Sequence, residues 1–151
     1  ILKLSEMLRY VTYENESENV YVKDEIQFIQ NYIDLFSRRF DNHLAIEFEH
    51  SEIDQSIQIP SLLLIHFVEN ALKHGITNDP EKPVKIKLNT VENHLVFSVE
   101  NYFRTHENYD ESGIGYKNIR QRLDLLFPQK HSLDVMEKDD FYKVELNIPI
   151  S

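Results

Sequence analysis

A chain of 151 residues is the right length for one domain with its own core, and a composition of 41% hydrophobic and 28% charged residues is that of an ordinary globular protein. The sequence contains no cysteine, which excludes disulfide bonds, a thiolate nucleophile and cysteine-bound zinc. A formal net charge of -10 argues against wrapping nucleic acid or lying on an anionic membrane surface.

No part of the sequence has the pattern of a membrane span or a signal peptide. Its apolar stretches fall well short of the roughly 20 residues that cross a bilayer. The chain begins at Ile1, inside a pattern that is already helical. We therefore expect it to be part of a longer protein whose membrane segments lie upstream.

Apolar residues three and four positions apart predict two helices in the first third of the chain. The first helix covers residues 1 to about 13 and is followed by a polar stretch over 14–19. Its apolar positions are Ile1, Leu4, Leu8 and Val11. The second helix covers about residues 24–40, with the stripe Ile26, Ile29, Ile33, Phe36 and Phe40.

After residue 41 the apolar period changes to two, which is typical of strands. Strands are predicted around residues 44–48, 57–59, 84–88, 95–99, 133–135 and 144–148. Helices are predicted over 61–75, ending at Gly75, and over about 115–127, after a loop over 102–112. A mixed, mostly antiparallel sheet with helices on one face buries these stripes. The predicted fold class is therefore α+β, a two-layer α/β sandwich.

The helix predicted over 61–75 gathers polar side chains on one arc. At about 100° per residue, Lys73 and His74 lie within roughly 60° of Asn70, whereas Glu69 lies about 100° away. The amide oxygen of Asn70 is a hard ligand that suits magnesium, and Lys73 suits a phosphate as a point charge. The alternative is a helix that surfaces at its C-terminal end, with Glu69 and Lys73 as an ordinary i,i+4 pair.

Asn101 ends an alternating strand at the point where the predicted loop begins. A side-chain carbonyl at this place is able to accept a hydrogen bond from an exocyclic amine such as that of adenine. The alternative is local, because asparagine often ends strands and starts turns.

Gly113-Ile114-Gly115 brings two of the three glycines of the chain to the predicted start of one helix. Glycine lets backbone N–H groups approach an anion, and a helix N-terminus supplies free donors with a partial positive charge. The alternative is tight packing with no ligand, since the segment does not complete a dinucleotide fingerprint.

Together these segments resemble the LytS-type sensor histidine kinases. The resemblance rests on Ile59-Pro60 with Val68-Glu-Asn-Ala-Leu-Lys-His-Gly75, and on Gly113-Ile-Gly115 with Asn118-Ile-Arg-Gln-Arg-Leu123. The segments Leu8-Arg-Tyr10 and 24–33 agree with it, so the resemblance covers nearly the whole chain.

The resemblance implies the Bergerat ATP-binding fold shared with gyrase, heat-shock chaperones and mismatch-repair ATPases, with ATP and Mg²⁺ as cofactors. Asn70 would hold the magnesium that bridges the ATP phosphates, and the stretch over 102–112 would be the lid over ATP. Glu69 is the implied base that polarises the attacking imidazole. The implied nucleotide-binding residues are Asn70, Lys73, His74, Asn101, Gly113, Ile114, Gly115 and Asn118.

Two departures from the family pattern concern the adenine end of the site. Asn101 replaces the usual aspartate, so this contact keeps an acceptor but loses a charge. The usual Asp-x-Gly-x-Gly does not follow, because residues 102–104 contain no glycine. These changes favour the alternative function, a degenerate, non-catalytic interaction domain with weak or no nucleotide binding.

The predicted function is the ATP-binding catalytic domain of a bacterial two-component sensor histidine kinase, which phosphorylates a histidine upstream of Ile1. Residues 1–15 are then the end of the dimerisation helix and residues 20–151 the catalytic domain, so the chain alone is not expected to autophosphorylate. The implied partners are a response regulator of the LytTR DNA-binding type and, through the upstream helices, a second copy of the chain. No direct nucleic-acid contact is expected, and the dependence on ATP implies a cytoplasmic domain.

Overall fold

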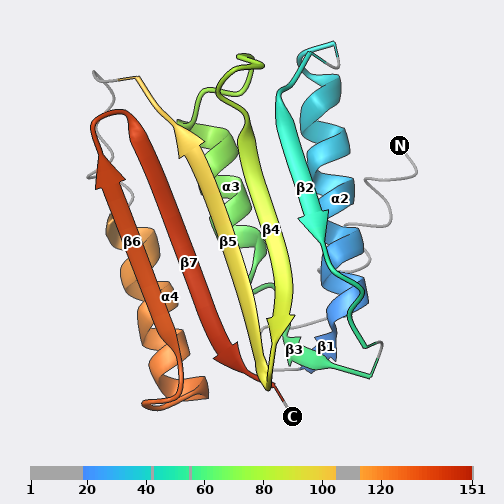
Figure 1. The fold of residues 1–151 in the computed structure, drawn as a ribbon, viewed down its shortest axis with the longest axis vertical. Helices are drawn as coiled ribbons and strands as arrows, with labels where there is room; N and C mark the ends of the chain where they lie inside the picture. Colours follow the sequence, from blue (N-terminus) through green and yellow to red (C-terminus); the bar gives the residue numbers. More distant parts are fainter. Residues whose placement is uncertain (1–18, 42, 55, 105–112, 151) are drawn as a thin grey trace.

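The computed structural model describes residues 19–41, 43–54, 56–104 and 113–150 (Figure 1). The helix predicted over residues 1–13 and most of the loop predicted over 102–112 lie outside these ranges. The described helices are α2 (Val22–Arg38), α3 (Ile65–His74) and α4 (Gly113–Leu126). The described strands are β1 (Asn19–Tyr21), β2 (Ile46–His50), β3 (Gln58–Pro60), β4 (Val84–Val91), β5 (His94–Tyr102), β6 (Ser132–Lys138) and β7 (Phe141–Pro149).

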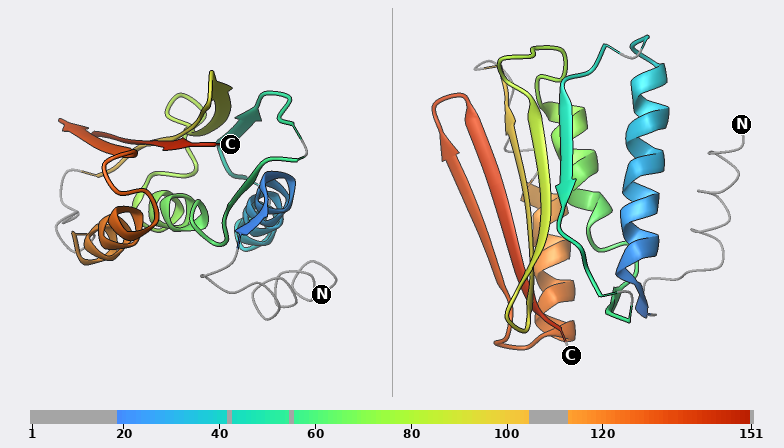
Figure 2. Two further views of the ribbon diagram at one scale, coloured as in Figure 1. Left: turned by 90° about the horizontal axis from the view of Figure 1, so that it is seen from below. Right: turned by 45° about the vertical axis from the view of Figure 1, so that its right-hand side comes forward.

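The main sheet has five strands in the order β2-β4-β5-β7-β6. The pair β2 and β4 is parallel, and the pairs β4–β5, β5–β7 and β6–β7 are antiparallel. All three helices lie on the same face of this sheet (Figure 2). The predicted two-layer α+β sandwich with a mixed, mostly antiparallel sheet is therefore confirmed.

The core lies between α3 and the middle of the sheet. Buried and half-exposed residues alternate strictly along β5 and β7, as expected for strands with one covered face. Phe67 of α3 and Phe97 of β5 are each 1% exposed, and their ring centroids lie 6.2 Å apart. Burial of such large apolar side chains fixes the height of α3 above the sheet.

A second sheet of two strands, β1 and β3, lies beside the main one. The strand predicted around 57–59 is β3, but its antiparallel partner β1 was not predicted. Val20 is the buried residue of β1, and three residues are too few to show a period of two. The backbone N–H of Val22, which follows β1, donates to the carbonyl of Ile57 at 3.0 Å.

The helix predicted from Ser61 begins at Ile65 instead. Leu62 has φ 58, in the left-handed region that a right-handed helix does not use. The turn is held by its neighbours: the Leu63 N–H donates to the buried carboxylate of Glu25 at 3.3 Å, and the Arg122 guanidinium donates to the Ser61 carbonyl at 2.7 Å. The start of α3 is thus attached to both α2 and α4.

In the described part of the chain, no helix combines the length and the apolar character that crossing a membrane requires.

Candidate functional site

The predicted polar arc lies on the second half of α3. Asn70 and His74 are half-buried, one turn apart, and Glu69 and Lys73 are exposed. Burial is the main cause of a raised pKa of Tyr32 on α2. The negative charge of Glu69 raises this pKa further, and the positive charge of Arg39 lowers it. Glu69 therefore faces the α2 side of the helix.

Asn70 turns the other way, toward α4. Its Nδ2 donates to the hydroxyl of Tyr116 at 3.2 Å. Tyr116 is 9% exposed, and its ring is stacked between Phe67 at 5.8 Å and Tyr142 at 6.4 Å. Tyr116 was not predicted from the sequence, although it begins a buried stripe along α4 with Ile119 three residues later.

The Tyr116 hydroxyl is also hydrogen-bonded to Tyr142 of β7. Burial raises the pKa of Tyr142, and the bond from Tyr116 and the charge of Arg120 offset part of that rise, whereas Glu137 adds to it. The Tyr142 hydroxyl therefore keeps its proton at physiological pH. The result is a chain of three polar groups from α3 through α4 to the sheet.

Asn101 lies directly behind the end of α3. It is 1% exposed, and its Nδ2 donates to the carbonyl of Tyr102 at 3.2 Å. A Cβ on Gly75 would stand 2.9 Å from this Nδ2 and 2.5 Å from the carbonyl oxygen of Ala71, so only a glycine fits between helix and strand. The Ile76 N–H donates to the Tyr102 carbonyl at 2.7 Å and closes the junction. The predicted contact of Asn101 with adenine stays a prediction.

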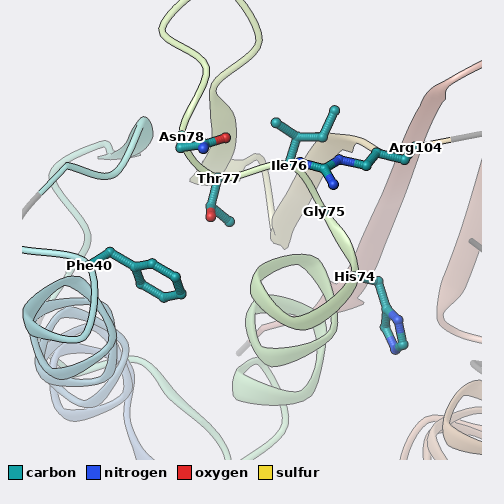
Figure 3. Close-up of a pocket in the computed structure, with 7 residues that line it drawn as sticks. All are labelled: Phe40, His74, Gly75, Ile76, Thr77, Asn78 and Arg104. Atoms are coloured by element: carbon teal, nitrogen blue, oxygen red, sulfur yellow. The ribbon is translucent and has the colours of Figure 1, made fainter.

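A pocket of about 250 Å³ opens beyond the end of α3 (Figure 3). Its lining comes from the chain just past α2, from the end of α3 with the loop that follows, and from the chain just past β5. These residues are Phe40, His74, Gly75, Ile76, Thr77, Asn78 and Arg104. His74 is the predicted site residue that belongs to this lining.

The glycine segment forms the start of α4. The helix predicted from about 115 begins at Gly113, so Gly113, Ile114 and Gly115 lie in its first turn, which contains no acidic residue. Asn118 is exposed on the same helix. Because Tyr116 contacts Asn70, the first turn of α4 stands next to the asparagine of α3. The N–H groups in the first turn of a helix have no partner within the helix and suit anions.

The described side chains contain no group of three or more histidine, cysteine, aspartate or glutamate residues suited to a metal ion. The predicted role of Asn70 as a magnesium ligand stays a prediction. A magnesium ion is commonly bound in this way, through one or two protein ligands together with phosphate oxygens.

Residues 1–44 match the family model described as histidine kinase. An uncharacterised sensor-like histidine kinase of Staphylococcus epidermidis is 32% identical over 129 residues, which are 82% of this chain and 23% of that protein. The chain belongs to the histidine kinases. The sensor histidine kinase BtsS of Escherichia coli K12 is 27% identical over 137 residues, 88% of this chain and 24% of BtsS. This histidine kinase chain thus spans about a quarter of the length of these relatives.

Solved structures show the same fold. The catalytic domain of histidine kinase ThkA superposes with a TM-score of 0.61 at 15% identity, covering 89% of this chain and 96% of that one. Full-length ShkA in complex with AMPPNP gives 0.60 at 18% identity, covering 99% and 35%. ThkA in complex with the response regulator TrrA gives 0.61 at 14% identity, covering 98% and 47%. The fold of this chain is that of histidine kinase catalytic domains.

Proposed function

We propose that this chain is the ATP-binding catalytic domain of a two-component sensor histidine kinase of the LytS type. It transfers the γ-phosphoryl group of ATP to a histidine of the dimerisation region. The observation that carries the proposal is the contact between Asn70 and Tyr116, which joins a half-buried amide on α3 to the first turn of α4. The complex of ShkA with AMPPNP, an ATP analogue on the same fold, supports the choice of ligand.

The residues at this junction fit a magnesium–nucleotide pair. Magnesium, when bound, neutralises phosphate charge. Asn70 supplies an amide oxygen for it, the exposed Lys73 on the next turn is a point charge that suits phosphate, and the N–H groups at Gly113–Gly115 suit phosphate oxygens. The pocket beside His74 suits the base or the ribose.

In the proposed transfer, an imidazole nitrogen forms a bond to the γ-phosphorus while the bond from that phosphorus to the bridging oxygen breaks and ADP leaves. The protein contributes mainly position and charge neutralisation. Glu69 is the proposed base that polarises the imidazole, and its exposed carboxylate on the α2 side of α3 requires that the histidine approach from there.

The proposed organisation follows from the same function. Residues 1–15 are the end of a dimerisation helix, residues 20–151 are the catalytic domain, and dimers form through helices upstream. The partner is a response regulator, as TrrA is for ThkA, and we propose the LytTR DNA-binding type. Use of ATP implies a cytoplasmic domain, and we propose that it belongs to a membrane-anchored bacterial protein.

A second candidate function is a non-catalytic interaction domain that keeps the fold and binds nucleotide weakly or not at all. The burial of Asn101 favours it, because a side chain that is 1% exposed and packed on Gly75 reaches a base only if the end of β5 rearranges. Nucleotide affinity separates the two candidates.

The deciding experiment is a titration of the chain with a fluorescent ATP analogue, with and without magnesium. For the kinase domain, Asn70→Ala is expected to weaken binding about 10- to 100-fold in magnesium, equivalent to about 1.4–2.8 kcal/mol, and to leave magnesium-free binding unchanged. An amide–metal contact vanishes with the metal, whereas a contact to the base does not. Asn101→Ala is expected to weaken both forms alike.

Asn89→Ala is the matched control, since Asn89 is exposed on β4. The kinase proposal fails if the wild-type chain binds no nucleotide. The metal role of Asn70 fails if folded Asn70→Ala loses affinity equally with and without magnesium, or if it loses only thermal stability.

A further inference from the structure

An asparagine amide has two different ends, and the Tyr116 contact uses one of them. The NH₂ group of Asn70 donates to the Tyr116 oxygen at 3.2 Å, so the amide oxygen takes no part in this bond. A cation accepts the oxygen end as a ligand and is repelled by the NH₂ end. The contact that fixes the orientation of the Asn70 amide therefore determines whether its oxygen or its NH₂ group faces a bound cation.

Tyr116 is itself firmly held. Its ring lies in a stack between Phe67 and Tyr142, with interplanar angles of 25° and 24°. Its hydroxyl donates to the oxygen of Tyr142, which leaves the Tyr116 oxygen as the acceptor for Asn70. Tyr142 is 4% exposed and belongs to β7, which is paired on both of its edges. The orientation of the amide is thus set by the sheet, through two phenols.

We propose that Tyr116 is a positioning residue, whose hydroxyl, fixed by Tyr142, holds the Asn70 amide with its oxygen as the end available to the metal of a bound nucleotide. This inference rests on the proposed magnesium–nucleotide function. Tyr116 does not touch the metal or the phosphates. Its contribution is to fix the rotation of the Asn70 amide before the nucleotide binds. Binding then does not have to offset the entropy lost when this side chain is ordered.

The hydroxyl can be separated from the ring. Tyr116→Phe keeps the ring that stacks between Phe67 and Tyr142 and deletes the hydroxyl, which accepts from Asn70 and donates to Tyr142. We expect this variant to lower the affinity for a fluorescent ATP analogue about two- to tenfold in magnesium, the range of one hydrogen bond, and to leave magnesium-free binding unchanged. Tyr142→Phe is expected to cause a smaller loss of the same kind. Tyr21→Phe, at an exposed tyrosine of β1, is the matched control.

A double-mutant cycle tests whether Tyr116 acts through Asn70. Tyr116→Phe introduced into Asn70→Ala is expected to cause no further loss in magnesium, because the amide that it positions is gone. A purely structural role predicts instead that the two losses add.

The outcomes separate this inference from the function on which it rests. No gain in affinity from magnesium in the wild-type chain overturns both. A wild-type gain that Tyr116→Phe leaves intact overturns the positioning role alone. That role is also overturned if Tyr116→Phe binds more tightly, since the contact would then compete with the metal, or if the loss is equal with and without magnesium.

Discussion

Gly75 occupies the narrowest junction of the site, between the end of α3 and the end of β5. Its φ of -83° is open to any residue, so its requirement is space and not backbone freedom. A methyl group there would lie 2.5 Å from the Ala71 carbonyl oxygen and 2.9 Å from the amide nitrogen of Asn101. A backbone carbonyl in a helix cannot give way as a flexible side chain does.

We therefore expect Gly75→Ala to lower the free energy of unfolding by about 1–3 kcal/mol, the usual cost of overpacking. Urea denaturation measures this change. Asn78→Ala, at an exposed neighbour on the same loop, is expected to change it by less than about 0.5 kcal/mol. A Gly75→Ala protein as stable as the wild type would mean that the helix end moves freely.

At the residue scale, the sequence relates candidate site residues to one another only along α3. Its 100° spacing was enough to group Asn70 with Lys73 and His74. The Tyr116 hydroxyl is 46 positions away and reaches Asn70 only because α4 packs beside α3, so local spacing contained no signal for the contact. The burial of Asn101 likewise follows from the crossing of two elements.

The turn before α3 shows how neighbouring elements override local pattern. Apolar spacing predicts a helix from Ser61, but the chain first turns through Leu62 with φ 58. The turn is held by Glu25 of α2 and Arg122 of α4. The same limit applies to β1, which exists because β3 pairs with it. Longer strands and helices, each with a clear period, were all predicted, with ends shifted by a few residues.

Arg122 offers a test of this turn. Arg122→Met keeps the apolar stem and removes the donor to the Ser61 carbonyl, so we expect a loss of about 1–3 kcal/mol in the free energy of unfolding. Arg38→Met, at an exposed position on α2, is the control and is expected to be nearly neutral. Chemical denaturation of both variants gives the comparison, and equal stabilities would show that the turn does not depend on α4.

For the whole molecule, one face of the sheet is covered by helices and the other bears charge. The register aligns Glu47 with Lys85, Lys85 with Glu100 and Glu100 with Lys143 across four strands. Opposite charges on facing positions favour this register, and a one-residue slip of any strand would bring its charges into the core. The open face therefore helps to specify the pairing that fixes Tyr142 and Asn101.

Position in the sheet also sets an order of local stability. β5 is paired on both edges, and Leu95, Phe97 and Val99 are at most 1% exposed. β6 is an edge strand whose Val135 and Met136 are 41% and 49% exposed. Opening an edge strand breaks one ladder and exposes little apolar surface, whereas opening β5 breaks two ladders and exposes the core.

Amide hydrogen exchange is therefore expected to be slowest in β5, with opening free energies that approach the global value, and faster in β6 and β2. Exchange followed by NMR or mass spectrometry in the absence of nucleotide measures this order. Exchange in β5 as fast as in β6 would contradict it. The consequence for the site is direct, because Asn101 belongs to β5 and Tyr142 to its neighbour β7. If these strands are the slowest to open, Tyr142 and Asn101 stay fixed behind Asn70 and Gly75. The helix ends and loops that face a bound ligand are then the parts of the site that move when it binds.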